Sequence, residues 1–177
     1  MKAIILFFLL MSHELYSFNP IRSLFDSVLN YKAHKQYQQG DFSKAEYEYQ
    51  QLLADDPGNP EYEYNVGVSL YKQKKYEQAQ AQFLKTVEHA HDHASLQERA
   101  LFNRGNCFFE QNQWQNAIDE YKKVLQINAN NQNAQHNLQL AEQKLQEQKR
   151  KEQEQKKKEE EQKKQQQQDQ KQDKQND

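Results

Sequence analysis

The sequence is poor in cysteine and glycine. Cys107 is the only cysteine among 177 residues, so the chain cannot form an internal disulfide. Its four glycines stand far apart, which excludes a glycine-rich loop of the kind that cradles phosphate. No nucleophile with a neighbouring base and no pair of buried carboxylates can be recognised. The sequence therefore argues against an enzyme and calls for no cofactor.

Long apolar runs are also missing. The run over Ala3–Met11 has nine residues, whereas a membrane-spanning helix needs about 20. No apolar residue occurs after Leu145. The formal charge is −2, and no long stretch has a consistent excess of Lys or Arg. The chain therefore lacks the basic surface that binding to nucleic acid requires.

The first 17 residues are typical of a secretion signal. Lys2 supplies a positive start, the apolar run follows, and Ser12–Ser17 is a short polar region that could end in a cut after Ser17. This pattern predicts an exported protein of the periplasm or cell envelope. Two alternatives stay open, a retained N-terminal anchor and a buried first helix. No cysteine follows the run, which argues against a lipoprotein.

The dominant feature of the chain is a repeated order of small and aromatic residues. Two of the alanines in this order, Ala45 and Ala79, are 34 residues apart, and the next, Ala117, follows after 38. We expect the four additional residues in the loop after the second copy. The residues that carry the pattern are Ala33, Gly40, Ala45, Tyr49 and Pro57 in the first copy, Gly67, Leu70, Tyr76, Ala79 and Phe83 in the second, and Gly105, Phe108, Trp114, Ala117 and Tyr121 in the third.

This order and spacing closely resemble the tetratricopeptide repeat. The resemblance covers roughly residues 26–140 and implies an all-α, right-handed α-solenoid of three helical hairpins with a capping helix. We expect a repeat domain over residues 18–145, with repeats at about 26–59, 60–93 and 98–131 and the capping helix from 132. Such arrays hold other proteins, so the expected function is a binding module without catalysis.

The helices can be placed from their start and stop signals. Asn19-Pro20 predicts a helix from about Pro20 to Gln39, and the second helix should begin near Ser43 after the Gly40-Asp41 turn. Pro57 ends that helix and Pro60 starts the next. The later turns, Lys74-Lys75 and Asn112-Gln113, lack the glycine of the first but should have the same shape.

Small residues are expected where the two helices of a hairpin cross. Gly67 and Gly105 should lie opposite Ala79 and Ala117, with large aromatic residues filling the space one turn further along. Cys107 lies on the same helix as Gly105 and is predicted to act as a small hydrophobic residue.

The C-terminal part combines a capping helix with a polar tail. Ala134, Leu138, Ala141 and Leu145 form an apolar stripe that can cover the last hairpin. Residues 146–177 are a low-complexity tail of Lys, Arg, Glu, Asp, Gln and Asn. Pairs such as Glu147 with Lys151 favour a solvated helix to about Lys164 that frays beyond it. The tail is either a solubilising spacer or a docking segment.

In the repeat family the first helices of successive hairpins line a concave groove. Asn65, Asn103 and Asn137 occupy equivalent positions on these helices and could bind the main chain of an extended peptide. The alternative is that these amides satisfy neighbouring helix groups. The other residues expected to contribute to peptide binding are Tyr64 and Phe102 as aromatic anchors, and Arg99 and Lys72 as contacts for an acidic group.

Some members of the family grip the terminal carboxylate of chaperones with two lysines, two asparagines and an arginine. Asn65 matches one of these positions. The other four positions hold different residues here, which argues against a chaperone-tail clamp: they are Asn30, His34, Arg99 and Asn103.

One cluster could carry metal chemistry. His89, His91 and His93 alternate in a segment that we expect to be an extended loop, and imidazoles suit zinc, copper or nickel. A firm site also needs fixed second-shell partners, which a short exposed loop does not provide. We therefore assign no metal site and keep metal binding as a minor alternative.

The whole chain also resembles the small tetratricopeptide proteins of bacterial aerotolerance (Bat) operons. The similarity lies in the signal-like start, the short repeat array, the segment AQHNLQLAEQKL and the Gln, Lys and Glu tail. It implies an envelope partner with a von Willebrand factor A domain. The competing hypothesis is an assembly scaffold that acts through its charged tail or convex face.

Overall fold

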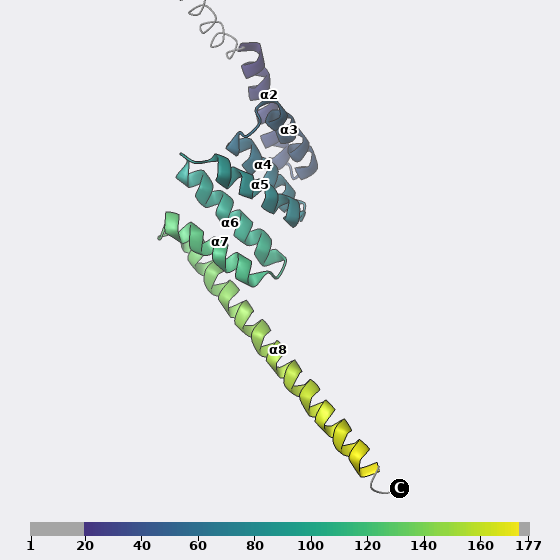
Figure 1. The fold of residues 1–177 in the computed structure, drawn as a ribbon. Coiled ribbons are helices and arrows are strands. Elements are labelled where there is room, and N and C mark those ends of the chain that lie inside the picture. Colours follow the sequence, from purple (N-terminus) through teal and green to yellow (C-terminus); the bar gives the residue numbers. More distant parts are fainter. Residues whose placement is uncertain (1–19, 174–177) are drawn as a thin grey trace, which may run out of the picture.

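A computed structural model describes the fold of residues 20–173, and all seven elements in that range are α-helices. The predicted signal over residues 1–17 lies outside the described residues. Figure 1 shows the helices stacked in chain order as a solenoid, with the last helix leaving it at one end. The predicted all-α fold is confirmed. The elements are α2 (Pro20–Gln38), α3 (Phe42–Asp55), α4 (Pro60–Lys72), α5 (Tyr76–His89), α6 (Ala94–Glu110), α7 (Trp114–Ile127) and α8 (Gln132–Asp173).

Side-chain caps start the helices near the predicted residues. Asp41 accepts a hydrogen bond from the backbone N–H of Lys44 at 3.2 Å, so α3 begins one residue before the expected Ser43. Asn59 accepts from the backbone N–H groups of Glu61 and Tyr62, and Pro60 occupies the first turn of α4. These caps satisfy backbone donors that have no partner inside the helix.

The turns within the hairpins share one backbone conformation. Gly40 has a φ of 81°, and the equivalent residues Lys74 and Asn112 have φ values of 61° and 59°. The predicted common shape is therefore confirmed. Lys74 and Asn112 adopt a left-handed conformation that disfavours a Cβ atom, so these two turns are less favourable than the first.

The helices of the second and third hairpins cross at a glycine packed against an aromatic ring. A Cβ atom on Gly67 would lie 2.7 Å from Cε1 of Phe83, and one on Gly105 would lie 2.6 Å from Cε1 of Tyr121. The closest contact of each glycine is thus the ring, rather than the alanine that we expected opposite it. Both rings are fully buried.

The additional residues of the third repeat form a helical turn, which corrects the predicted loop insertion. Helix α6 begins at Ala94, so the connection from α5 contains only residues 90–93. Leu96 in this turn is 3% exposed, and the Gln97 amide donates to the backbone carbonyl of Val87 at 3.3 Å. The burial of Leu96 favours a helical conformation of this segment, because Leu96 then extends the apolar face of α6.

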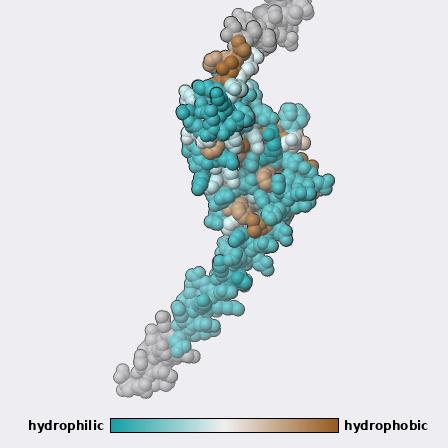
Figure 2. Space-filling model, turned by 180° about the vertical axis from the view of Figure 1, so that it is seen from behind, coloured by the Kyte–Doolittle hydropathy of each residue, from teal (hydrophilic) through white to brown (hydrophobic). Residues whose placement is uncertain are grey.

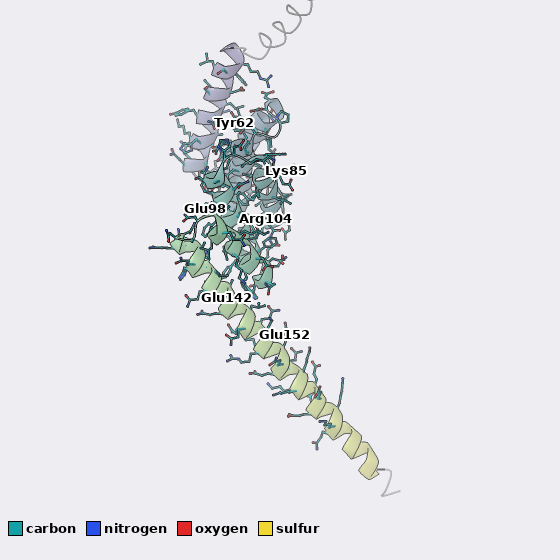
Figure 3. The ribbon with its side chains drawn as sticks, turned by 60° about the vertical axis from the view of Figure 1, so that its left-hand side comes forward. Tyr62, Lys85, Glu98, Arg104, Glu142 and Glu152 are labelled. Carbon is teal, nitrogen blue, oxygen red and sulfur yellow. The ribbon has the colours of Figure 1, made fainter. Side chains whose placement is uncertain are left out.

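Helix α8 combines the predicted cap and tail. Ala134 and Ala141 are fully buried, and Leu138 and Leu145 pack beside Tyr121, which confirms the capping stripe. The helix continues to Asp173, nine residues past the predicted end at Lys164. Glutamine is a good helix former, which explains the continuation. Figure 3 shows tail side chains such as Glu152 projecting away from the repeats.

The N-terminal end of the solenoid exposes apolar side chains. Leu24, Phe25 and Val28 on α2 are 66%, 62% and 58% exposed. Figure 2 shows this apolar patch on a surface that is otherwise largely hydrophilic. Within residues 20–173, no helix has the length and apolar content needed to cross a membrane.

Replacing Gly67 by alanine should lower the free energy of unfolding by about 1 to 3 kcal/mol, because the new methyl group overlaps the Phe83 ring. Urea denaturation measures this loss. In the double variant Gly67→Ala with Phe83→Leu, the smaller side chain relieves the overlap, so the two effects should not add. Strict additivity would contradict a direct contact.

Candidate peptide-binding groove

The first helices of successive hairpins enclose one face of the solenoid. Helix α4 contacts α6 directly, whereas the second helices α5 and α7 make no comparable contact. A pocket of about 280 Å³ opens on this face between α4, α6 and α8. We call the face the concave groove and this space the groove pocket. The groove pocket is lined by Tyr71, Asn106, Phe109, Glu110, Tyr121, Asn137 and Leu140.

The three predicted asparagines lie half-buried at equivalent positions on these helices. Asn103 donates a hydrogen bond to the hydroxyl of Tyr64 at 2.9 Å, and Asn137 donates to Oδ1 of Asn106 at 3.0 Å. The side chain of Asn65 has no hydrogen-bond partner among the described residues. Asn103 and Asn137 therefore each use an amide N–H group in a hydrogen bond inside the protein. Their side-chain oxygens remain available as acceptors.

The two predicted aromatic anchors pack against the rings at the hairpin crossings. Tyr64 lies 5.8 Å from the Phe83 ring and Phe102 lies 5.9 Å from the Tyr121 ring, measured between centroids. Both side chains are half-buried. Burial raises the pKa of Tyr64, against the opposing effects of Arg99 and of the hydrogen bond from Asn103, so the phenol stays protonated at neutral pH.

The two predicted cations differ in their surroundings. The guanidinium of Arg99 lies 4.6 Å from the centroid of the Tyr64 ring and 3.5 Å from both carboxylate oxygens of Glu61. Lys72 is exposed and forms no ion pair with the described residues. An acidic ligand would therefore compete with Glu61 for Arg99 but would find Lys72 open.

Among the predicted peptide-binding residues, only Asn137 lines the groove pocket. The lining residues that were not predicted to bind peptide include Tyr71, Phe109, Glu110 and Leu140. Helical spacing could have found two of them. Tyr71 follows Tyr64 by seven residues and Phe109 follows Phe102 by seven, which places each on the same helix face as the predicted anchor.

Comparisons with known proteins agree with this geometry. A family model described as "Tetratricopeptide repeat" matches residues 36–101, and a second with the same description matches residues 98–131. Together they span more than half of the chain. The chain belongs to the tetratricopeptide-repeat family. No curated protein sequence matches it.

Solved tetratricopeptide domains have the same fold. The first repeat domain of Spaghetti (RPAP3), bound to the HSP90 peptide SRMEEVD, is 26% identical with a TM-score of 0.62 over 68% of this chain and 92% of that chain. The first such domain of human RPAP3 is 25% identical with a TM-score of 0.63, over 71% and 95%. The second domain of human RPAP3, in complex with the HSP70 peptide SGPTIEEVD, is 17% identical with a TM-score of 0.59, over 66% and 98%.

The single cysteine of this tetratricopeptide domain is a packing residue. Cys107 is fully buried, and burial together with the charge of Glu110 raises its pKa to about 12. The thiol therefore stays protonated, and the predicted role as a small hydrophobic residue is confirmed.

The three histidines have separate surroundings. Nδ1 of His89, the last residue of α5, lies 2.9 Å from both carboxylate oxygens of Glu63 on α4. The Glu63 side chain is 3% exposed. His91 and His93 lie in the connection to α6, and no group of three or more His, Cys, Asp or Glu side chains in the described part of the chain is placed to share a metal ion. His89 thus ties the second hairpin together.

Replacing His89 by alanine should lower the free energy of unfolding by about 1 to 3 kcal/mol, because the buried carboxylate of Glu63 loses its partner. His91→Ala is the matched control and should change it by less than about 0.5 kcal/mol, since His91 is exposed. Chemical denaturation of both variants measures the difference. Equal stability of the two variants would contradict a structural role for His89.

Proposed function

We propose that this chain is a non-catalytic protein-interaction module that holds an extended segment of a partner protein in its concave groove. The observation that carries the proposal is the groove pocket, to which α4, α6 and the capping helix α8 each contribute side chains. A groove of this kind buries a peptide along several repeats at once. Repeat arrays commonly use such surfaces to bind proteins.

The open amide groups favour an extended main chain as the ligand. Asn65 has a complete amide without an internal partner, and the side-chain oxygens of Asn103 and Asn137 are free to accept. A peptide unit carries one donor and one acceptor, so it can pair with these groups whatever its side chains are. Tyr64 and Phe102 then supply an apolar floor beneath the peptide.

The solved relatives support peptide binding but not the same ligand. One of them is bound to a peptide that ends in Glu-Glu-Val-Asp. In this chain the position of one expected lysine is Arg99, which is already paired with Glu61, and His34 lies 2.9 Å from the amide nitrogen of Gln38. A grip on the acidic tail of a chaperone is therefore not proposed.

We place this activity in the bacterial cell envelope, on the evidence of the signal-like residues 1–17. The partner in this proposal is an envelope protein with a von Willebrand factor A domain, and the process is Bat-type aerotolerance. Both rest on the resemblance of the whole chain. Cell fractionation with N-terminal sequencing tests the location: a mature start at Phe18 supports export, and intact Met1 in the cytoplasmic fraction contradicts it.

The second candidate is a scaffold that acts through helix α8. This helix has 42 residues, which corresponds to a length of about 63 Å. Beyond Leu145 its ion pairs, such as Lys151 with Glu147 at 2.7 Å, lie within the helix, and Figure 3 shows this part of the helix leading away from the repeats. The exposed charges could dock on a partner that never enters the groove.

A pull-down from the native cell separates the two candidates. The double variant Asn65→Ala with Asn103→Ala should reduce captured partner by about tenfold, the loss expected when roughly 1.4 kcal/mol of binding energy is removed. A chain that ends at Leu145 should keep its partner.

The matched control for the groove variant is Asn116→Ala, which removes an exposed amide on α7 outside the groove. It should leave capture unchanged. Capture that survives the groove variant but is lost when residues 146–177 are removed would favour the scaffold and contradict the groove.

A further inference from the structure

The groove pocket is small. Its volume of about 280 Å³ lies below the range of about 300 to 1,000 Å³ that is typical for small-molecule sites. The walls include residues of two first helices and of the capping helix, such as Tyr71 on α4, Phe109 on α6 and Leu140 on α8. One long side chain of a bound peptide fits into this space, while the rest of the peptide follows the groove.

Hydrogen bonds fix the polar wall of the pocket. Oδ1 of Asn106 accepts from the hydroxyl of Tyr121 at 2.8 Å and from the amide of Asn137 at 3.0 Å. Both acceptor positions of that oxygen are therefore used. The amide nitrogen of Asn106 and the side-chain oxygen of Asn137 have no partner among the described residues. They can bond the peptide unit that carries the inserted side chain.

The charge of the pocket is negative. Glu110 is the only ionisable acid or base in the lining apart from the tyrosines, and it forms no ion pair with any cation of the described residues. Burial and the negative charge of Glu110 raise the pKa of Tyr71 to about 12. Lys72 and Lys144 hold the repeat positions equivalent to Glu110, but neither lines the pocket or pairs with Glu110. Lys144 lies 3.8 Å from Glu147 on its own helix.

Glu110 has a hydrogen bond with the Tyr76 side chain but no cation as a partner among the described residues. Aromatic rings beside such a carboxylate are a favourable site for a cation. The faces of Tyr71 and Phe109 can cover the stem and charge of a lysine or arginine, and Glu110 can pair with its head. The protein already uses this combination internally, since Arg99 lies over the Tyr64 ring and beside Glu61.

We propose that the groove pocket binds a lysine or arginine side chain, so that this groove selects a basic segment of its partner. This preference is opposite in charge to the HSP90 peptide SRMEEVD held by the Spaghetti (RPAP3) domain. The inference rests on the proposed function, because it names the class of peptide that the concave groove takes.

A selection experiment with the full chain tests the preference. A phage library of random linear decapeptides is selected against the wild type, against Glu110→Lys and against Glu88→Lys. Glu88 is an exposed acid on α5, so its variant makes the same change of charge outside the pocket. The wild type and Glu88→Lys should both enrich Lys or Arg at one fixed position, and Glu110→Lys should lose that enrichment.

Fluorescence anisotropy on one selected peptide then measures the contact directly. Replacing its selected lysine by norleucine should weaken binding to the wild type by about tenfold and binding to Glu110→Gln by less than about twofold. This coupling is the signature of a direct pair. Circular dichroism of Glu110→Gln checks the fold, which should be unchanged because Glu110 is exposed at the end of α6.

The other outcomes overturn the inference. Enrichment of Asp or Glu, or enrichment of Lys and Arg that persists in Glu110→Lys, shows that the pocket does not select a cation. In that case, selected peptides that bind the wild type but not the double variant Asn65→Ala with Asn103→Ala would still support the proposed binding of peptides in the concave groove. If no peptide is enriched, or if binding survives that double variant, the proposed function fails together with the inference.

Discussion

The rest of this structure depends on one contact, in which a glycine packs against an aromatic ring. It occurs in the second and in the third hairpin. Gly67 admits the Phe83 ring and Gly105 admits the Tyr121 ring, so the paired helices approach closely. The Tyr121 ring also extends through the crossing, and its hydroxyl bonds Asn106 in the groove. One side chain thus sets both the spacing of the helices and the orientation of the groove amides.

Polar groups at the boundaries between helices add specificity to this packing. The buried carboxylate of Glu63 pairs with His89, and that of Glu120 pairs with Arg104 at 3.4 Å and Lys123 at 2.7 Å. A buried charge that loses its partner is costly, so each pair disfavours a shifted register of the helices. The groove depends on that register, because its lining comes from helices of successive repeats.

The sequence predicts the helices and their core well, because caps, prolines and spacing act locally. The loop that we predicted for the four additional residues before Glu98 is wrong, because a change in repeat period reports only their number and not their conformation. The burial of Leu96 decides the matter in favour of helix. The partners of Asn103 and Asn137 also lay beyond reach, because Tyr64 and Asn106 are 39 and 31 residues away in the chain. Such pairs can be predicted only when the rotation between neighbouring hairpins is known.

Site-specific photo-crosslinking in the native cell tests most directly whether a partner lies in the concave groove. A photoreactive residue at Val68 occupies the repeat position equivalent to Asn106, which lines the groove pocket. One at Leu84, a partly exposed residue of α5, reports on the outer helices. A partner that lies in the concave groove should crosslink from position 68 and not from position 84. A crosslink from position 84 alone would contradict it.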